Sequence, residues 1–317
     1  MIESPPTRQH RFGGRLVRYR FYTCDVFTDR VFGGNQLAVL TDARGLDTAR
    51  MQAIAAEFGY SETTFVLPPD DPRHAARVRI FTPRAEIGFA GHPTVGTALV
   101  LAWTGAVPVP AEGAAIVLEE GAGPVPVEIR AEDGRATAAE FVAPVAARAG
   151  APVDPGPVAH ALGLGPADLA AEPGLPCVAS AGVPFLCVRV VGLDALARAR
   201  LDPTAVLPGE AADGVLLFTT ATGSAGHDLR ARMYAPRHGI AEDPATGRAA
   251  AALAGLLAAR SDGGDGWLGL RIGQGIEMGR PSLILARARR AGGQVAEVRV
   301  GGGAVPVAEG WIEVPAA

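Results

Sequence analysis

GFAGHPTVGTA at residues 88–98 and GIAEDPATGRAA at residues 239–250 each place a small, glycine-bearing polar loop directly before an apolar run. The runs predict two buried helices, over residues 92–103 and 249–260. Pro93 suits the first turn of the first helix, where a missing N–H costs little. Because a helix start exposes backbone N–H groups and partial positive charge, each helix presents a place where an anion can bind.

The segments leading into these loops also match. RIFTPR at residues 79–84 corresponds to RMYAPR at residues 232–237, and GLD occurs at both 45–47 and 192–194. A composition rich in Ala, Gly and Arg explains part of this similarity. We interpret the pattern as a duplicated unit, in which strands surround one central helix per half.

This interpretation predicts an α+β fold with two pseudo-symmetric domains, each a mixed sheet or barrel around its helix. The Ala-, Pro- and Gly-rich residues 144–157 are a candidate linker. The expected parts are a flexible tail at 1–17, an N-terminal domain at 18–145, a C-terminal domain at 146–300 and a closing strand at 301–317. The residues leave open whether that strand returns to the N-terminal domain.

Composition excludes several classes of function. The 317 residues have a net charge of -4, which argues against a nucleic-acid-binding protein. No apolar run approaches the ~20 residues of a membrane span. The absence of lysine excludes a Schiff-base or P-loop lysine, and the histidines and cysteines show no metal-ligand spacing. We expect a cytoplasmic protein without a cofactor or metal, and without nucleic-acid or membrane partners.

The two helix starts are Gly91-His92 and Gly247-Arg248. Glycine has no Cβ to block a ligand's approach to the backbone. Each start alone is explained by close packing of small residues. Their occurrence on matched units favours one shared site, in which both helices bind the same small carboxylate.

Five segments carry a resemblance to a known family: GGNQLAV, FGYSETTFV, FTPRAEIGFAGHPTVG, RMYAPRHGIAEDPATG and GQGIEMGRPS. In this order they resemble the signature segments of the phenazine-biosynthesis isomerase (PhzF-like) family, from about residue 18 onward. The resemblance implies a diaminopimelate epimerase-like fold, similar also to proline racemase, with the site in the cleft between domains. It also implies a homodimer.

The resemblance assigns roles to individual residues. Glu62 matches the catalytic carboxylate, and His92 and Asp243 match its two polar partners. Gly91 and Gly247 match the glycines whose N–H groups hold the substrate carboxylate.

At the position after Gly247 the family's usual serine is Arg248 here. This arginine either reshapes the anion pocket or extends to solvent from the first helical turn.

The residues themselves allow structural interpretations of the same positions. Glu62 at a strand start is commonly a surface carboxylate, and His92 is a helix-entry histidine. Asp243 before Pro244 is typical of a turn. The Gly-Gly-Asn turn alone accounts for Asn35.

A two-thiol racemase mechanism does not fit this chain. It needs one cysteine at each helix start, and the corresponding positions are Ala90 and Thr246. Proton transfer by Glu62 alone, first as base and then as acid, remains.

The resemblance implies a cofactor-independent isomerase acting on trans-2,3-dihydro-3-hydroxyanthranilate or a related small cyclic amino or hydroxy acid. Two alternatives remain. One is a small-carboxylate-binding protein without catalysis. The other is an isomerase or epimerase for a different acidic metabolite, in which Arg248 selects a second negative charge.

Overall fold

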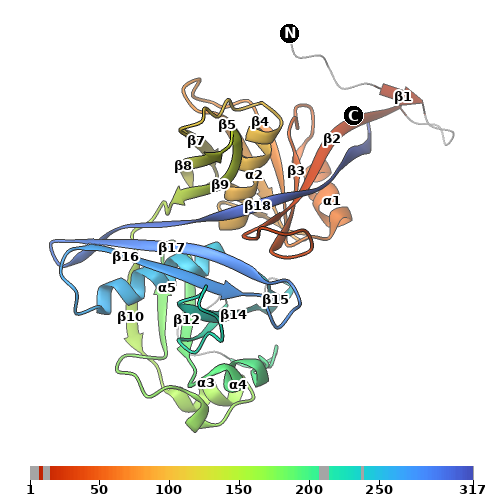
Figure 1. The fold of residues 1–317 in the computed structure, drawn as a ribbon. Coiled ribbons are helices and arrows are strands. Elements are labelled where there is room, and N and C mark those ends of the chain that lie inside the picture. Colours follow the sequence, from red (N-terminus) through yellow and green to blue (C-terminus); the bar gives the residue numbers. More distant parts are fainter. Residues whose placement is uncertain (1–6, 10–14, 207–213, 237–238, 317) are drawn as a thin grey trace.

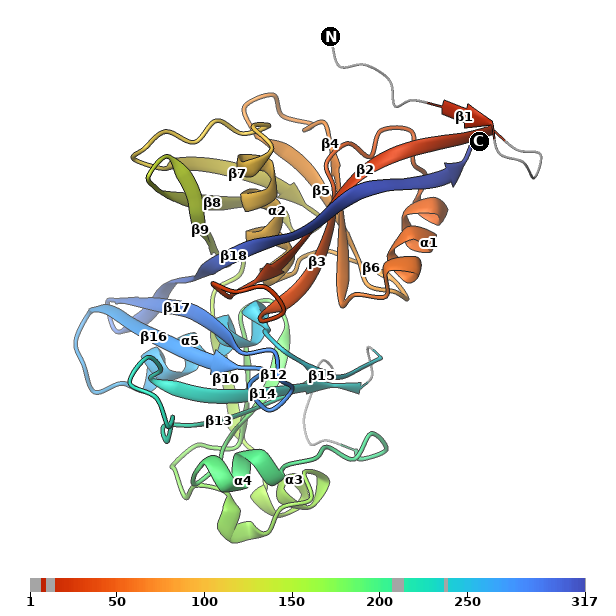
Figure 2. The ribbon, with the colours of Figure 1, turned by 45° about the vertical axis from the view of Figure 1, so that its right-hand side comes forward.

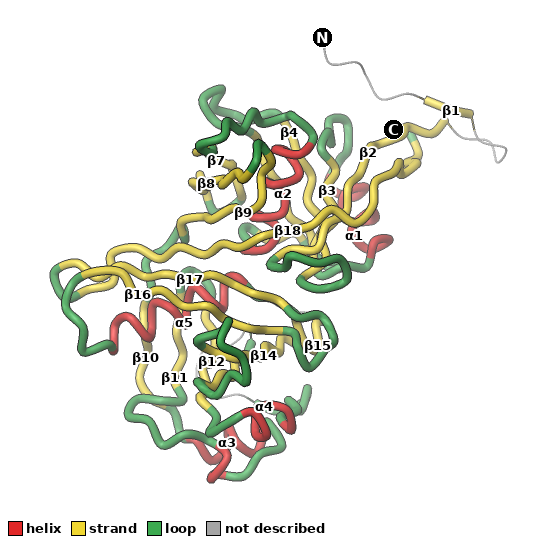
Figure 3. Tube along the Cα trace, in the orientation of Figure 1, coloured by secondary structure: helices red, strands yellow, loops and turns green. Residues whose placement is uncertain are grey.

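The computed structural model describes residues 7–9, 15–206, 214–236 and 239–316. They form two lobes, each with strands around one long helix, which confirms the predicted α+β class (Figure 1). Figure 3 shows α2 (Gly91–Trp103) among the strands of the first lobe and α5 (Gly247–Arg260) among those of the second.

The strands of the first lobe close into a ring. Each pairs with the next, β3 with β4 and β5 with β7 in parallel and the other pairs antiparallel. In ring order they are β2 (Arg15–Val26), β3 (Asn35–Leu40), β4 (Glu62–Leu67), β5 (Ala76–Phe81), β7 (Ala114–Glu120), β8 (Gly123–Glu132), β9 (Arg135–Val142) and β18 (Gln294–Pro315).

The second lobe repeats this order of pairings. The parallel pairs are now β12 with β13 and β14 with β16, and β17 leads into β18. Its strands are β10 (Arg148–Pro152), β11 (Cys177–Ser180), β12 (Pro184–Arg189), β13 (Val215–Thr219), β14 (Leu229–Ala235), β16 (Gly266–Gln274) and β17 (Ser282–Ala291).

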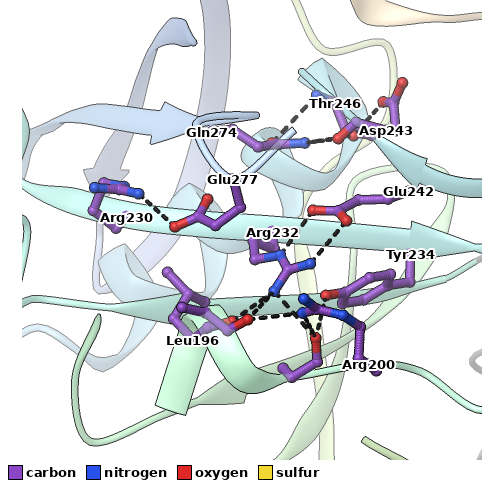
Figure 4. Close-up of polar contacts among 12 residues, drawn as sticks. Leu196, Arg200, Arg230, Arg232, Tyr234, Glu242, Asp243, Thr246, Gln274 and Glu277 are labelled. Carbon is purple, nitrogen blue, oxygen red and sulfur yellow. Dashed lines mark hydrogen bonds and ion pairs between the residues drawn. The ribbon is translucent and has the colours of Figure 1, made fainter. Parts of the chain in front are cut away.

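A matched arginine in each lobe supports duplication. Arg79 on β5 donates two hydrogen bonds to Glu86 on β6 (Glu86–Ile87), 2.7 and 2.6 Å long. Arg232 on β14 does the same to Glu242 on β15 (Ile240–Asp243), at 2.8 Å each (Figure 4). Each arginine also contacts a peripheral helix, through Thr48 in α1 (Thr48–Phe58) and the Leu196 carbonyl in α4 (Leu193–Arg198).

The two long helices are buried because their sequences are apolar on all sides. Residues 91–101 of α2 are all buried, as is most of α5. The second lobe adds an outer apolar cluster beneath the short α3 (Pro155–Ala161), the 3-10 turn Pro166–Asp168 and α4.

Strand β18 belongs to both lobes. Its first half pairs with β17 of the second lobe and β9 of the first, and residues 304–315 pair with β2. It runs as one dark blue ribbon across the molecule in Figures 1 and 2.

Two segments expected to lack regular structure contain strands. In the tail, Thr7–Gln9 form β1, which pairs with the start of β2, whereas residues 1–6 and 10–14 lie outside the described part of the chain. The Ala- and Pro-rich linker segment contains β10, which pairs with β11. Propensity misses β10 because its partner β11 lies about 30 residues further along the chain, whereas β1 pairs locally with Arg15–Val17.

None of the described helices is long and apolar enough to cross a membrane.

Candidate active site

Glu62 is placed by the helix stop that precedes it. Helix α1 begins at its N-cap Asp47, whose carboxylate accepts from Arg50 N, and ends at Gly59 with a left-handed φ of 64°. The chain then enters β4 at Glu62, which pairs in parallel with Leu37 of β3. Glu62 is only 6% exposed, so the surface-carboxylate interpretation is wrong.

The two helix starts touch each other. A Cβ built on Gly91 would lie 2.7 Å from Gly247 Cα, and one built on Gly247 would lie 3.0 Å from Gly91 Cα. Only glycine at both positions allows this contact between backbones. The predicted convergence of α2 and α5 is therefore present, with positive ends of both helices at one point.

A small cavity of about 60 Å³ lies at this junction. One buried water needs roughly 10–15 Å³, so the cavity has room for about four to six water-sized groups and none for a polymer. Both lobes line it. Its charged or titratable residues are Glu62, His92, Asp243 and Arg248, and its apolar side includes Ile87, Ala90, Phe185, Met233, Ala235 and Ile240.

Glu62 and His92 face each other across the cavity. His92 Nε2 lies 3.4 Å from Glu62 Oε2, and the side chains are 5% and 7% exposed. Neither atom has a hydrogen-bond partner in the described structure. Buried polar atoms without partners are costly, so both are available to a ligand.

Burial sets the protonation of the three residues. It raises the pKa of Glu62 to about 8, with the Asp243 charge adding to the shift and the Arg248 charge opposing it. Burial likewise raises the pKa of Asp243 to about 6, against the hydrogen bonds from Thr246 and Asn35. Burial lowers the pKa of His92 to about 3, so its imidazole is neutral at physiological pH.

Asp243 is held by hydrogen bonds. Thr246 Oγ1 donates to its Oδ2, and Ser61 Oγ lies 3.5 Å from its Oδ1. Gln274 Nε2 donates to the Asp243 carbonyl at 2.7 Å and to Thr246 Oγ1 at 3.1 Å (Figure 4). Asp243 is thus more than a turn residue, because its carboxylate is buried, bonded and turned to the cavity.

Asn35 is the polar residue that sequence reasoning assigned to a turn alone. Its Nδ2 donates to Asp243 Oδ1 at 2.8 Å and the Ala245 carbonyl at 3.0 Å, and lies 3.2 Å from His92 Nδ1. The amide has two N–H protons for these three neighbours, so one of the protons is shared between two of them. The GGN segment belongs to one of the family-like motifs, which drew attention to Asn35. Only the fold shows that Asn35 of the first lobe bonds Asp243 and Ala245 of the second.

Arg248 lies at the cavity rather than extending away from it. It is partly buried in the first turn of α5 and lines the cavity beside Gly247. Its positive charge lowers the pKa of Glu62, His92 and Asp243.

Within the part of the chain that the structure describes, no group of three or more His, Cys, Asp or Glu side chains is arranged to hold a metal ion.

Nearly the whole chain is similar to proteins of one known family. The family model for phenazine biosynthesis-like proteins (PhzC-PhzF) matches residues 24–310. An uncharacterised isomerase of Mesorhizobium japonicum is 44% identical, over 90% of this chain and 96% of its own. A trans-2,3-dihydro-3-hydroxyanthranilate isomerase of Pseudomonas aeruginosa is 35% identical, over 92% and 98%.

Solved structures show the same fold. A PhzF-family phenazine biosynthesis protein of Bacillus anthracis superposes with a TM-score of 0.85 at 25% identity, covering 94% of this chain and 99% of its own. The match spans both lobes and the helix junction. The chain therefore belongs to the phenazine biosynthesis-like (PhzC-PhzF) family and is an isomerase.

Proposed function

We propose that the protein is a cofactor-independent isomerase in which Glu62 alone moves a proton between two carbons of a small cyclic amino or hydroxy acid. The observation that carries this proposal is the buried Glu62–His92 contact at the junction of the helix starts. Trans-2,3-dihydro-3-hydroxyanthranilate, named for the Pseudomonas aeruginosa relative, is the substrate we propose to test first.

The substrate carboxylate binds the free N–H groups at the starts of α2 and α5, where Gly91 and Gly247 leave the backbone open. This places the ring of the substrate against the apolar side of the cavity. His92 and Asp243 then orient its amino or hydroxyl groups.

The proton moves in two balanced steps. Glu62 as carboxylate removes a proton from a ring carbon, and the electron pair of the broken C–H bond enters the conjugated system. The protonated Glu62 then returns that proton to another carbon of the system in a 1,3-type shift, which regenerates the carboxylate. No electrons are gained or lost, so the residues suffice without a redox partner.

A single base agrees with the asymmetry between the lobes. Thr64 pairs with Ile80 in the first lobe, and Leu216 pairs with Met233 in the second. The duplicated segments match Ile80 with Met233. Counting back along the paired strands then makes Gly214 the second-lobe equivalent of Glu62. The second lobe thus offers no carboxylate at the corresponding position.

The test is turnover of trans-2,3-dihydro-3-hydroxyanthranilate in deuterated solvent. General acid–base groups contribute ~10²–10⁴-fold, so Glu62→Gln should lower kcat by that factor while the substrate still binds. Glu57→Gln, which changes an exposed carboxylate on α1, is the control. Wild-type turnover by Glu62→Gln removes Glu62 from the mechanism, and binding without turnover by the wild type excludes this compound as the substrate.

The position of Arg248 favours a second candidate, an isomerase for a different acidic metabolite that carries a second negative charge. We would compare the binding of benzoate and phthalate to the wild type and to Arg248→Ser. If Arg248 contacts the second charge, Arg248→Ser weakens phthalate binding at least tenfold and benzoate binding little. An unchanged ratio excludes this role.

A further inference from the structure

A second buried carboxyl group lies outside the cavity, beneath the start of α2. Glu120 ends strand β7 and is 7% exposed. Its Oε1 lies 2.7 Å from Thr94 Oγ1, and its Oε2 has no hydrogen-bond partner in the described structure. The proposed mechanism does not use it.

The hydrogen bonds of Thr94 require a proton from elsewhere. Thr94 Oγ1 lies 2.7 Å from the Ala90 carbonyl oxygen and also 2.7 Å from Glu120 Oε1. A hydroxyl has one proton to donate, and both neighbours would be acceptors if Glu120 were ionised. Both contacts are satisfied when Glu120 is protonated, donates to Thr94, and leaves Thr94 to donate to Ala90.

The second lobe has an amide at the position that matches Glu120, although its threonine partner, Thr246, matches Ala90 rather than Thr94. Ala76 of β5 pairs with Leu118 of β7, and Leu229 of β14 pairs with Ile272 of β16. Two residues further along, Glu120 and Gln274 therefore occupy matching positions at the strand ends.

Gln274 shows how this position acts. Its Nε2 donates to Thr246 Oγ1, and Thr246 in turn donates to the Asp243 carboxylate (Figure 4). A neutral amide donor, a threonine hydroxyl and a site acceptor thus form a chain. In the first lobe, Glu120 can donate to a threonine as the amide does only when it is a neutral carboxylic acid.

We propose that Glu120 is held as a neutral carboxylic acid that donates a hydrogen bond to Thr94 and thereby positions the Gly91 N–H at the candidate site. Ala90 C=O and Gly91 N–H belong to one planar trans peptide unit and point in opposite directions. Holding the carbonyl with Thr94 therefore aims the N–H toward α5. Glu120 is a positioning residue and does not contact the ligand.

No other charge competes for this role. Burial raises the pKa of Glu120 to about 8, and a hydrogen bond donated by Thr94 to the ionised carboxylate would oppose this shift. The neighbouring charged groups are Glu119, with His74 bonded to it, and Arg77 on the paired strand β5. Glu119 alternates to the other face of the sheet. Burial and the contact with Thr94 are the two influences on the pKa of Glu120.

Infrared difference spectra of wild type minus Glu120→Gln test the protonation without any substrate. At about pH 7 the difference should show the carbonyl band of a neutral carboxylic acid, because Glu120 is the group removed. A carboxylate band in its place overturns the proposal. Glu57→Gln is the matched control and should show a carboxylate band.

Thermal unfolding gives a second readout. A raised pKa in the folded state means that the stability due to Glu120 is complete below its ordinary pKa and is lost as pH rises through about 8. Glu120→Gln should match the wild type at about pH 5 and unfold at a higher temperature than it at about pH 9. An equal deficit of the variant at both pH values contradicts the proposal.

The positioning role rests on the proposed function and is tested by benzoate binding. Thr94→Val should weaken binding several-fold, and Glu120→Gln should not, because the amide still donates to Thr94. If Glu120→Gln weakens binding as much as Thr94→Val, the positioning role is wrong. Failure of the isomerase proposal alone leaves the infrared and unfolding results unchanged.

Discussion

Glu62 combines burial, a neighbouring carboxylate and an unpartnered oxygen. Burial and the Asp243 charge raise its pKa to about 8, and the unpartnered oxygen has no hydrogen bond that would stabilise the charged form. A carboxylate with this pKa is a stronger base, when ionised, than an ordinary glutamate. The same burial keeps His92 neutral, so the pair carries no net charge when Glu62 is protonated.

The pH dependence of the reaction follows from this. If Glu62 must be ionised to accept the proton, kcat/KM rises about tenfold per pH unit below about 8 and levels off above it. Steady-state kinetics between about pH 5 and 9 measure this. A profile that is level across the range, or a midpoint near the ordinary glutamate value, contradicts Glu62 as the base.

The sequence predicted Glu62, His92 and Asp243 through their motifs, and the fold brings all three into one cavity. Asn35, Glu120 and Gln274 could not be assigned in the same way. They act through contacts with residues distant in sequence, and local patterns contain no information about such partners. For Glu120, the signal appears only once β7 and β16 are seen to match.

At the scale of elements, the decisive feature is the backbone contact between α2 and α5. Two helix starts repel each other because both carry partial positive charge. Burial of both helices, on the other hand, holds them together. An anion bound between the two starts would relieve this repulsion, as the proposed carboxylate site requires.

Gly91→Ala tests this contact. The new Cβ would meet Gly247 Cα at 2.7 Å, so the helices must separate. We expect benzoate binding to weaken about tenfold or more, and stability to fall by ~1–3 kcal/mol from overpacking. Calorimetric titration and chemical unfolding measure these effects.

Gly264→Ala is the control, because its Cβ would meet nothing within 4 Å. Unchanged benzoate affinity in Gly91→Ala contradicts the assignment of the helix junction as the carboxylate site.

At the scale of the molecule, a clamp from the second lobe stabilises the loop before Asn35. Arg280 donates to Asp25 Oδ1 at 2.5 Å, to the Gly33 carbonyl at 2.6 Å and to the Gly34 carbonyl at 2.9 Å. Asp25 is 3% exposed, so removing the arginine leaves a buried carboxylate without its cation. The clamp therefore links lobe docking to the position of Asn35.

Arg280→Gln should lower the free energy of unfolding by about 3 kcal/mol, toward the lower end of the range for a broken buried pair because Arg280 is partly exposed. Chemical denaturation measures the loss. Arg73→Gln, which breaks a solvent-exposed pair with Asp71, should show no measurable change. Equal effects of the two variants would mean that the clamp does not stabilise the lobes.

The architecture of two strand-wrapped helices was predictable because the duplicated segments and apolar helices are local signals. The closed ring of the first lobe was not, since its last pairing joins residues 16–26 to residues 304–315. The sequence left open whether the closing strand returns, and pattern alone cannot decide between partners of similar apolarity.

Strand β18 has a consequence for how the chain is made. Seven of the eight strands around α2 emerge early from the ribosome, but the eighth is translated only after the whole second lobe. Until residues 304–315 have emerged, β2 has an open edge and the first lobe is exposed to misassociation and chaperone binding. The part of the protein that is synthesised first is therefore the part that closes last.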